Sequence, residues 1–250
     1  MTIKDSVWQT YIKRLRRVSS EAASQMSKYL ATTEWFLNNR TKQAAINYAY
    51  ALATKYGEAA TALACDMYDS VVAASAAKIA GAAEPARTAT YAEVARAING
   101  TAKTGNEDLM ASSVDRMVKM AGMDTTMQNA IRDGAEWAWI PSGDSCAFCL
   151  ELASNGWQRA SRAVLNGDHC DHIHANCDCT FAIRFDSDSG VQGYNPSTYK
   201  RIYANAEGSN SKEKLNSIRR DLYAQNKDEI NAQKREAYAK RQEREEEAED

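Results

Sequence analysis

The first long segment of the chain repeats apolar side chains at the spacing of an α-helix. Over residues 4–37 these positions recur with a period near 3.6 and lie on one face of a helix of about eight turns. They are Trp8, Tyr11, Ile12, Leu15, Val18, Ala22, Met26, Tyr29 and Leu30. Lys13, Arg14, Arg16 and Arg17 cluster on the polar side. That cluster is either a solvated face or a contact with phosphate or an acidic partner.

The next segment is rich in alanine. Residues 41–83 hold sixteen alanines, which favours a second helix or a helical hairpin bent near Gly57. Cys65 lies in this segment, away from the other cysteines, and we interpret it as a small buried hydrophobe. Pro85 ends the segment because proline cannot continue a helix.

Three further helical patterns precede the cysteines. The stretch "RTATYAEVARAING" predicts a short helix that closes at Gly100, and "TAKTGNED" predicts a loop. A stripe of apolar residues then predicts a helix ended by Gly122: Met110, Val114, Met117, Val118 and Ala121. One more helix is expected from Asp124 to about Glu136.

The character of the chain changes at "WAWIPSG". Trp137, Trp139 and Ile140 predict a short strand, and "CTFAIRF" alternates as a second strand. The stretch "DSDSGVQGYNPSTYK" predicts a loop or linker, and residues 211–250 predict a charged helix.

The expected fold is mainly α. It consists of a long-helix body, a small α+β module stapled by zinc, and a charged C-terminal helix. The predicted domains are 1–136, 137–185 and 186–250.

Composition narrows the classes of partner. The 250 residues include 31 basic and 33 acidic side chains, so no global field draws the chain to nucleic acid or an anionic membrane. No apolar run approaches the roughly 18–20 residues of a membrane span, and the N-terminus has no signal-peptide pattern. We therefore expect a reducing cytosol, in which clustered cysteines more often hold metal than form disulfides.

Five of the six cysteines and all three histidines lie between residues 142 and 181. Zinc takes four tetrahedral ligands, usually thiolates and imidazoles that are supplied in pairs by tight turns. Three short spacings provide such pairs: Cys146-x-x-Cys149, His174-x-x-Cys177 and Cys177-x-Cys179. Ser145 or Asp144 can cap a helix after the first pair. The sequence predicts a structural Zn²⁺ on Cys146, Cys149 and His174, with Cys177 or Cys179 as the fourth ligand.

Other chemistry fits less well. Cys170, His169 and His172 are left as neighbours or alternative ligands, and five cysteines cannot all pair as disulfides. The tripeptide Asp171-His172-Ile173 is similar to the start of the histidine–metal finger of HNH nucleases, but no histidine follows His174 to complete a catalytic site. A redox Cys-x-x-Cys needs a βαβ setting, and a zinc deaminase needs a His-x-Glu that this chain lacks.

The stretches "CAFCLELASNGW" and "HANCDCTF" resemble the C-terminal region of tailed-phage minor capsid proteins of the Mu gpF-like head-morphogenesis family. Cys146, Cys149, His174, Cys177 and Cys179 fill the five positions of that pattern in order. The resemblance covers residues 137–185, and it departs from the family in the insert "DHCDHI", which offers alternative ligands.

The resemblance implies a minor head protein that is present in few copies within a multi-protein assembly. Portal and major capsid proteins would be its partners, and packaged DNA an indirect one, with no role for a membrane. It would be located in the virion, at the capsid interior or portal vertex, and in the host cytoplasm during assembly. We expect no enzymatic activity. The competing hypotheses are a zinc-containing HNH-like nuclease and a zinc protein that binds nucleic acid.

Overall fold

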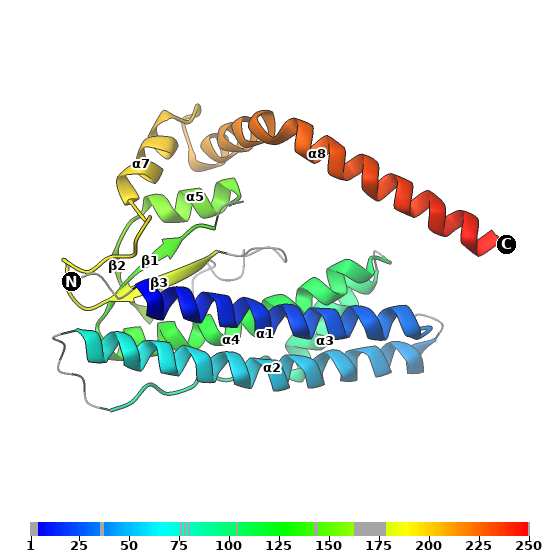
Figure 1. Cartoon of the computed structure of the whole chain (residues 1–250), viewed down its shortest axis with the longest axis horizontal. Helices are drawn as coiled ribbons and strands as arrows, with labels where there is room; N and C mark the ends of the chain where they lie inside the picture. The colour runs from blue at the N-terminus through cyan, green and yellow to red at the C-terminus, as the bar shows by residue number, and fades with distance from the viewer. Residues whose placement is uncertain are drawn as a thin grey trace. The chain divides into compact units, whose positions relative to one another are not determined.

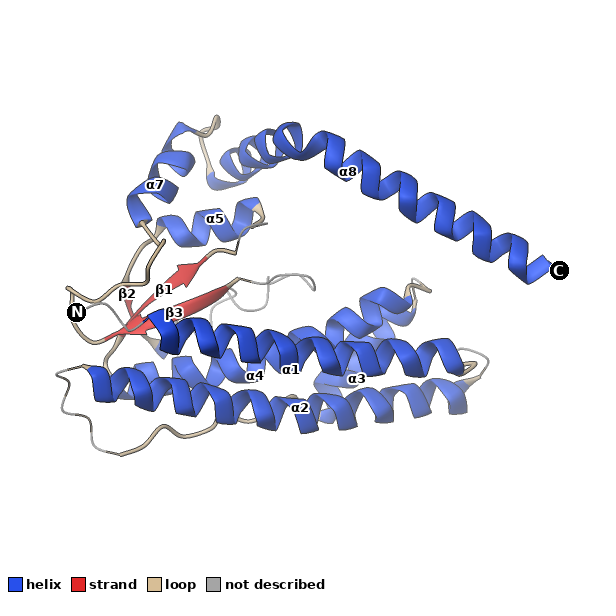
Figure 2. Cartoon of the chain, viewed as in Figure 1, coloured by secondary structure: helices blue, strands red, loops and turns tan. Residues whose placement is uncertain are grey.

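The computed structural model describes residues 5–35, 38–75, 77, 79, 81–103, 105–142, 145–162 and 179–249. Helices dominate these residues, and one small sheet accompanies them (Figure 2). The elements in chain order are α1 Asp5–Thr32, α2 Asn39–Ala74, α3 Tyr91–Ala102, α4 Glu107–Asp133, β1 Glu136–Ile140, α5 Ala147–Ser154, β2 Gln158–Arg159, β3 Thr180–Arg184, α7 Pro196–Asn205 and α8 Ser211–Glu249. The predicted mainly α class with a small α+β part is confirmed, whereas the zinc staple stays a prediction.

The chain forms two compact units that alternate along the sequence. The first contains Met1–Ser142 and Trp157–Tyr194, and the second contains Gly143–Gly156 and Asn195–Asp250. The domain limits expected from the sequence were 1–136, 137–185 and 186–250. They divide the chain differently from these two units, and they stay a prediction. No helix within the described part of the chain is both long and apolar enough to cross a membrane.

The first unit is built on three long helices. Figure 1 shows α1 and α2 side by side, and both pack against α4. The apolar face predicted for α1 is buried, including Trp8, Leu15 and Met26, while Lys13 and Arg17 on the other side are exposed. The long amphipathic helix predicted from the 3.6-residue period is therefore confirmed.

Of the two alternatives predicted for the alanine-rich segment, the single helix is confirmed, because α2 continues through Gly57 without a bend into a hairpin. The helix end predicted at Gly122 is wrong, because α4 also continues through that residue. A Cβ at Gly57 would lie 2.9 Å from Thr88 Cγ2, and one at Gly122 would lie 3.3 Å from the carbonyl oxygen of Ala60. Both glycines therefore let another segment of the same chain pack closely against the helix.

The second helix also ends earlier than expected. It begins with a capping box between Asn38 and Thr41, and it ends at Ala74, whereas the alanine-rich pattern extends to residue 83. Residues 82–90 instead run without regular secondary structure to Thr90, which caps α3. The short helix predicted from "RTATYAEVARAING" is confirmed, and its capping box pairs Thr90 with Glu93.

The sheet has the order β2-β1-β3, and all of its neighbours are antiparallel. Trp137 on β1 pairs with Ile183 on β3, which confirms both predicted strands. Arg184 at the end of β3 makes a side-chain contact with β1, because its Nε donates to Glu136 at 2.7 Å. Its guanidinium also lies 4.5 Å from the ring centroid of Trp157. This arginine uses both its charge and its planar face in one place.

The second unit consists of α5, α7 and α8. A small apolar core joins the three helices: Ala147, Ala206 and Ile218, with Leu150, Tyr203, Leu215 and Leu222 packed around them. The first half of α7 lies in the stretch ending at Lys200 that was predicted to be a loop or linker. Asn195 caps this helix, Pro196 occupies its first turn, and Tyr199, Ile202 and Tyr203 recur at helical spacing, so the sequence carried signals of a helix that were missed. The charged helix predicted over 211–250 is confirmed as α8.

Candidate metal centre

The first pair of predicted ligands lies at the start of α5. Cys146 is the residue that caps this helix, and Cys149 is the third residue inside it, so the two lie about one helical turn apart on the same side. Cys149 is 1% exposed, and Cys146 is half-buried. Two thiols one turn apart at the start of a helix suit two of the four ligands of a tetrahedral zinc ion.

The helix after this pair was predicted correctly, but its cap was not. Cys146 itself occupies the cap position, and its side chain makes no capping hydrogen bond. Ser145 therefore does not occupy the cap position, and Asp144 lies outside the described residues. The backbone carbonyl of Cys146 accepts from the N–H of Leu150 at 3.1 Å, as expected for the residue that caps a regular helix.

Cys179 stands directly before β3 and is 5% exposed. Its Sγ accepts a hydrogen bond from the backbone N–H of Ser142 at 3.4 Å, and the hydroxyl of Ser142 lies 3.8 Å from the same sulfur. The pairing of Ile140 with Thr180 brings these two strand ends together. Backbone donors aimed at a cysteine sulfur are a common way of orienting a thiolate ligand. This contact fixes the Cys179 sulfur beside the end of β1, and the choice between Cys177 and Cys179 as the fourth ligand stays open.

The remaining predicted ligands, His174 and Cys177, lie outside the described residues, as do Cys170, His169 and His172. The tripeptide that resembles the HNH motif lies there too. Within the described residues, no three histidine, cysteine, aspartate or glutamate side chains are grouped so that they could hold a metal ion. Cys146 and Cys149 belong to the second unit and Cys179 to the first. The complete ligand set therefore stays a prediction based on donor chemistry and spacing.

Comparison with protein-family models covers much more of the chain than the cysteine pattern does. The family model described as "VG15 protein" matches residues 2–206, which is most of the chain. The chain belongs to the VG15 protein family. VG15 is a family of phage proteins, so the phage origin predicted from the cysteine pattern is confirmed in this coarser form. Membership of the Mu gpF-like family, which the cysteines resemble, stays a prediction.

The VG15 match contains all five predicted metal ligands and ends before α8 begins at Ser211. A search of curated proteins and a search of solved structures both found no significant match. The family match therefore covers the helical body, the sheet, α5 and α7, and leaves α8 outside it.

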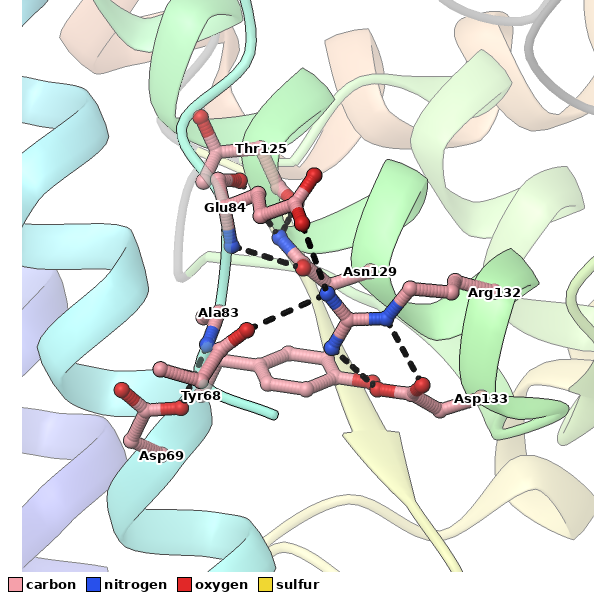
Figure 3. A network of polar contacts seen from close by, with 9 residues as sticks. Tyr68, Asp69, Ala83, Glu84, Thr125, Asn129, Arg132 and Asp133 are labelled. Atoms are coloured by element: carbon pink, nitrogen blue, oxygen red, sulfur yellow. Dashed lines mark hydrogen bonds and ion pairs between the residues drawn. The ribbon is translucent and has the colours of Figure 1, made fainter. Parts of the chain in front are cut away.

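A second polar cluster in this VG15 family member joins α2, α4 and the segment 81–90 (Figure 3). Asn129 is 1% exposed, and its side chain accepts from the N–H of Glu84 at 2.9 Å and donates to the carbonyl of Glu84 at 2.8 Å. Thr125 accepts from the N–H of Ala86 at 3.0 Å, and Asp69 accepts from the N–H of Ala83 at 2.8 Å. Side chains thus satisfy the backbone of a segment that has no secondary structure of its own.

The same cluster contains perturbed ionisable groups. Burial, reinforced by a hydrogen bond to Asp133, raises the pKa of Tyr68 above its usual value. Hydrogen bonds from Arg132 lower the pKa of Asp133. Perturbed pKa values mark either functional sites or structural ion pairs. The side chains here bond to one another and to the backbone of 81–90, which indicates a structural role.

The apolar periodicity of the sequence gave no sign of this cluster. Tyr68, Asn129 and Asp133 come from helices that are far apart in sequence, and each occupies an ordinary helical position. The one available signal was Pro85, which marks an extended segment whose backbone groups need partners.

Proposed function

We propose that this phage protein is a non-enzymatic structural component of the head, which acts in head assembly near the portal. In this proposal it binds one structural Zn²⁺ through Cys146, Cys149, His174 and one of Cys177 and Cys179. The observation that carries the proposal is the order Cys-x-x-Cys followed by His-x-x-Cys-x-Cys within the region that matches a phage family. The portal and major capsid proteins are the proposed partners.

The donor set supports zinc among the common metals. Thiolate and imidazole ligands in tetrahedral sets suit Zn²⁺, whereas Mg²⁺ and Ca²⁺ prefer oxygen ligands. The burial of Cys149 and the backbone donor on Cys179 are consistent with thiolate ligands held in fixed orientations. A filled tetrahedral set leaves no open position for substrate, and zinc of this kind stabilises the fold because metal binding is coupled to folding.

Co-assembly tests the proposed role. The full chain, the portal protein and the major capsid protein of the same phage are produced together, and assembled heads are purified and analysed by quantitative mass spectrometry. The proposal predicts that the chain copurifies with heads at a low, fixed ratio to the portal protein, and that heads assembled without portal contain much less of it. Heads that exclude the chain, with or without portal, would overturn the proposed role.

A nuclease assay tests the competing enzyme class. The purified chain is incubated with plasmid DNA in Mg²⁺ or Mn²⁺, alongside His172→Ala. The proposal predicts no cleavage above that of a mock preparation. Cleavage that His172→Ala abolishes would replace the structural proposal with a metal-dependent nuclease.

A further inference from the structure

Three basic side chains lie together on the exposed side of α1. Lys13, Arg14 and Arg17 are all exposed, and at 3.6 residues per turn they fall within about 100° of one another around the helix. Arg16 is exposed beside them and adds positive charge. The buried apolar side of α1 packs against α2 and α4, so the charged side points away from these two helices. We call Lys13, Arg14 and Arg17 the basic face of α1.

The basic face has no carboxylate partner. Among the described residues, none of its three side chains forms an ion pair. Glu21 follows Arg17 by one helical turn, but its Oε1 accepts a hydrogen bond from Gln25 Nε2 at 2.9 Å. On α4, by comparison, Lys119 pairs with Asp115 one turn away at 2.8 Å. The positive charge of the basic face is therefore left for something outside the described chain.

Asp66 on α2 does not neutralise Arg14 either. The two residues line the same hollow between α1 and α2, which has a volume of about 280 Å³. Asp66 is exposed, and no ion pair joins it to Arg14. An anion that approaches the basic face therefore does not have to displace a bound carboxylate.

The arrangement also works against the helix that carries it. Side chains three or four positions apart on a helix are neighbours, so Arg17 lies beside both Lys13 and Arg14. Like charges at these spacings destabilise a helix. The buried apolar side of α1 compensates for this repulsion, but a bound polyanion would remove it. A charge pattern that costs stability and has no partner within the described chain favours a role in binding.

We propose that the basic face of α1 binds the phosphates of duplex DNA. A duplex carries one negative charge for about every 1.7 Å of its axis, so several phosphates lie within reach of a cluster of cations. Lysine and arginine are the usual protein ligands of phosphate. The net charge of −2 on the whole chain does not oppose this local contact, because salt at about 0.1 M screens exposed charges that lie more than about 10 Å away.

The composition of the exposed side favours DNA over an acidic protein. Between residues 9 and 21 of α1, the exposed side chains other than the basic ones are Gln9, Thr10, Ser20 and Glu21, and none of them is apolar. A stable protein interface needs an apolar or aromatic centre that becomes buried. Phosphate contacts need only charge and hydrogen-bond donors, which hydroxyl and amide side chains also supply. The proposal goes beyond the proposed role in the head and does not depend on zinc.

A salt titration of DNA binding tests the proposal. The full chain is added to a fluorescently labelled duplex of about 20 base pairs, and anisotropy is measured between about 0.05 and 0.2 M salt. Three phosphate contacts predict that log K falls with log salt concentration at a slope of about −3. Lys13→Gln with Arg14→Gln and Arg17→Gln should weaken binding at least about tenfold at 0.05 M salt, and each lost contact should reduce the slope by about one. Arg17→Gln alone should fall between this variant and the unmodified chain.

A matched control removes the same charge elsewhere. Lys28→Gln with Arg40→Gln and Arg96→Gln also replaces one lysine and two arginines, which are exposed on α1, α2 and α3, and it should bind as the unmodified chain does. Thermal melting followed by circular dichroism checks folding. The variant without the basic face should melt no lower than the unmodified chain, because it has lost the like-charge repulsion.

Three results would overturn the proposal: no binding at 0.05 M salt, an affinity that does not change with salt, or an equal loss of affinity in the control variant. Poly-glutamate at the same concentration of charge is the competing ligand, and it should bind more weakly than the duplex. If it binds as tightly, the proposal is wrong and the basic face is assigned to an acidic protein partner.

Discussion

Gly122 on α4 lies directly against the hydroxyl of Tyr11 on α1. A Cβ at Gly122 would be 3.0 Å from Tyr11 Oη, and the carbonyl oxygen of Ala60 on α2 closes the other side of the same position. Three long helices therefore meet at a position where one of them has no side chain. Interiors packed at crystal-like density leave no room for an added methyl group at such a point.

Gly122→Ala is expected to destabilise the chain by about 1–3 kcal/mol, because an extra methyl group in a packed core forces neighbours to shift. This loss exceeds the gain of up to about 1 kcal/mol from the better helix propensity of alanine. Urea denaturation followed by circular dichroism measures the free energy of unfolding. Gly100→Ala is the matched control, since Gly100 lies in α3, is exposed, and has no atom within 4 Å of its added Cβ. It should raise stability, and equal effects at both positions would contradict the packing argument.

Tyr68→Phe tests the polar cluster. The phenol of Tyr68 donates to Asp133 at 2.8 Å, and Asp133 also accepts two hydrogen bonds of 2.8 Å from Arg132. Hydrogen bonds to charged groups contribute about 1.5–3 kcal/mol, so we expect a loss near the lower value because Arg132 still satisfies the carboxylate. Tyr50→Phe, at an exposed ring on α2, should leave the free energy of unfolding unchanged. A loss of less than about 0.5 kcal/mol for Tyr68→Phe would mean that this hydrogen bond of the cluster does not stabilise the fold measurably.

Glu93 gives a pH dependence with a defined sign. Hydrogen bonds from Arg87 lower the pKa of Glu93 from 4.5 to about 2. A carboxyl whose pKa is lower in the folded state stabilises the fold fully above its unfolded pKa, and that contribution is lost as the pH falls through the folded pKa. The stability difference between the unmodified chain and Glu93→Gln should therefore be constant above about pH 5 and disappear between pH 4.5 and about 2.

Denaturation at a series of pH values measures this difference. The Glu93 side chain is 40% exposed and the Arg87 side chain 67%, so solvent weakens the pair and the effect should be small. Glu58→Gln, at an exposed residue of α2, serves as the control and should not reproduce the pH-dependent difference. A difference between the unmodified chain and Glu93→Gln that grows as the pH falls from 4.5 would contradict the assigned ion pair.

The sequence predicts those parts of the fold that leave a periodic pattern. Helix α1 was found because its buried side recurs every 3.6 residues, and β3 was found because "CTFAIRF" alternates. Gly122 was misinterpreted as a helix end, and Gly57 left a hairpin open beside the single helix, because a glycine that permits close packing and one that ends a helix look alike in sequence. Contact between helices distinguishes the two cases, and that contact is a property of the tertiary structure.

The candidate metal site was predicted from residue type and spacing alone. Such a pattern identifies donors but not their surroundings, so the backbone donor of Ser142 on Cys179 could not be foreseen. Helix α7 was missed although Tyr199, Ile202 and Tyr203 recur at helical spacing, because the Gly193, Asn195 and Pro196 just before them are also typical of a loop. The pattern therefore supplies candidate ligands, and the structure adds the surroundings of those ligands that it describes.

Zinc content tests the central claim most directly. The full chain is purified without chelator or affinity metal, and its metal is measured by inductively coupled plasma mass spectrometry against protein concentration. We predict about one zinc per chain, reduced to a small fraction by Cys146→Ser and by Cys149→Ser, and unchanged by the control Cys65→Ser. Loss of zinc should also lower the melting temperature, because metal binding is coupled to folding. Less than about half an equivalent of zinc in the unmodified chain, or zinc that survives Cys146→Ser, would contradict the proposed centre.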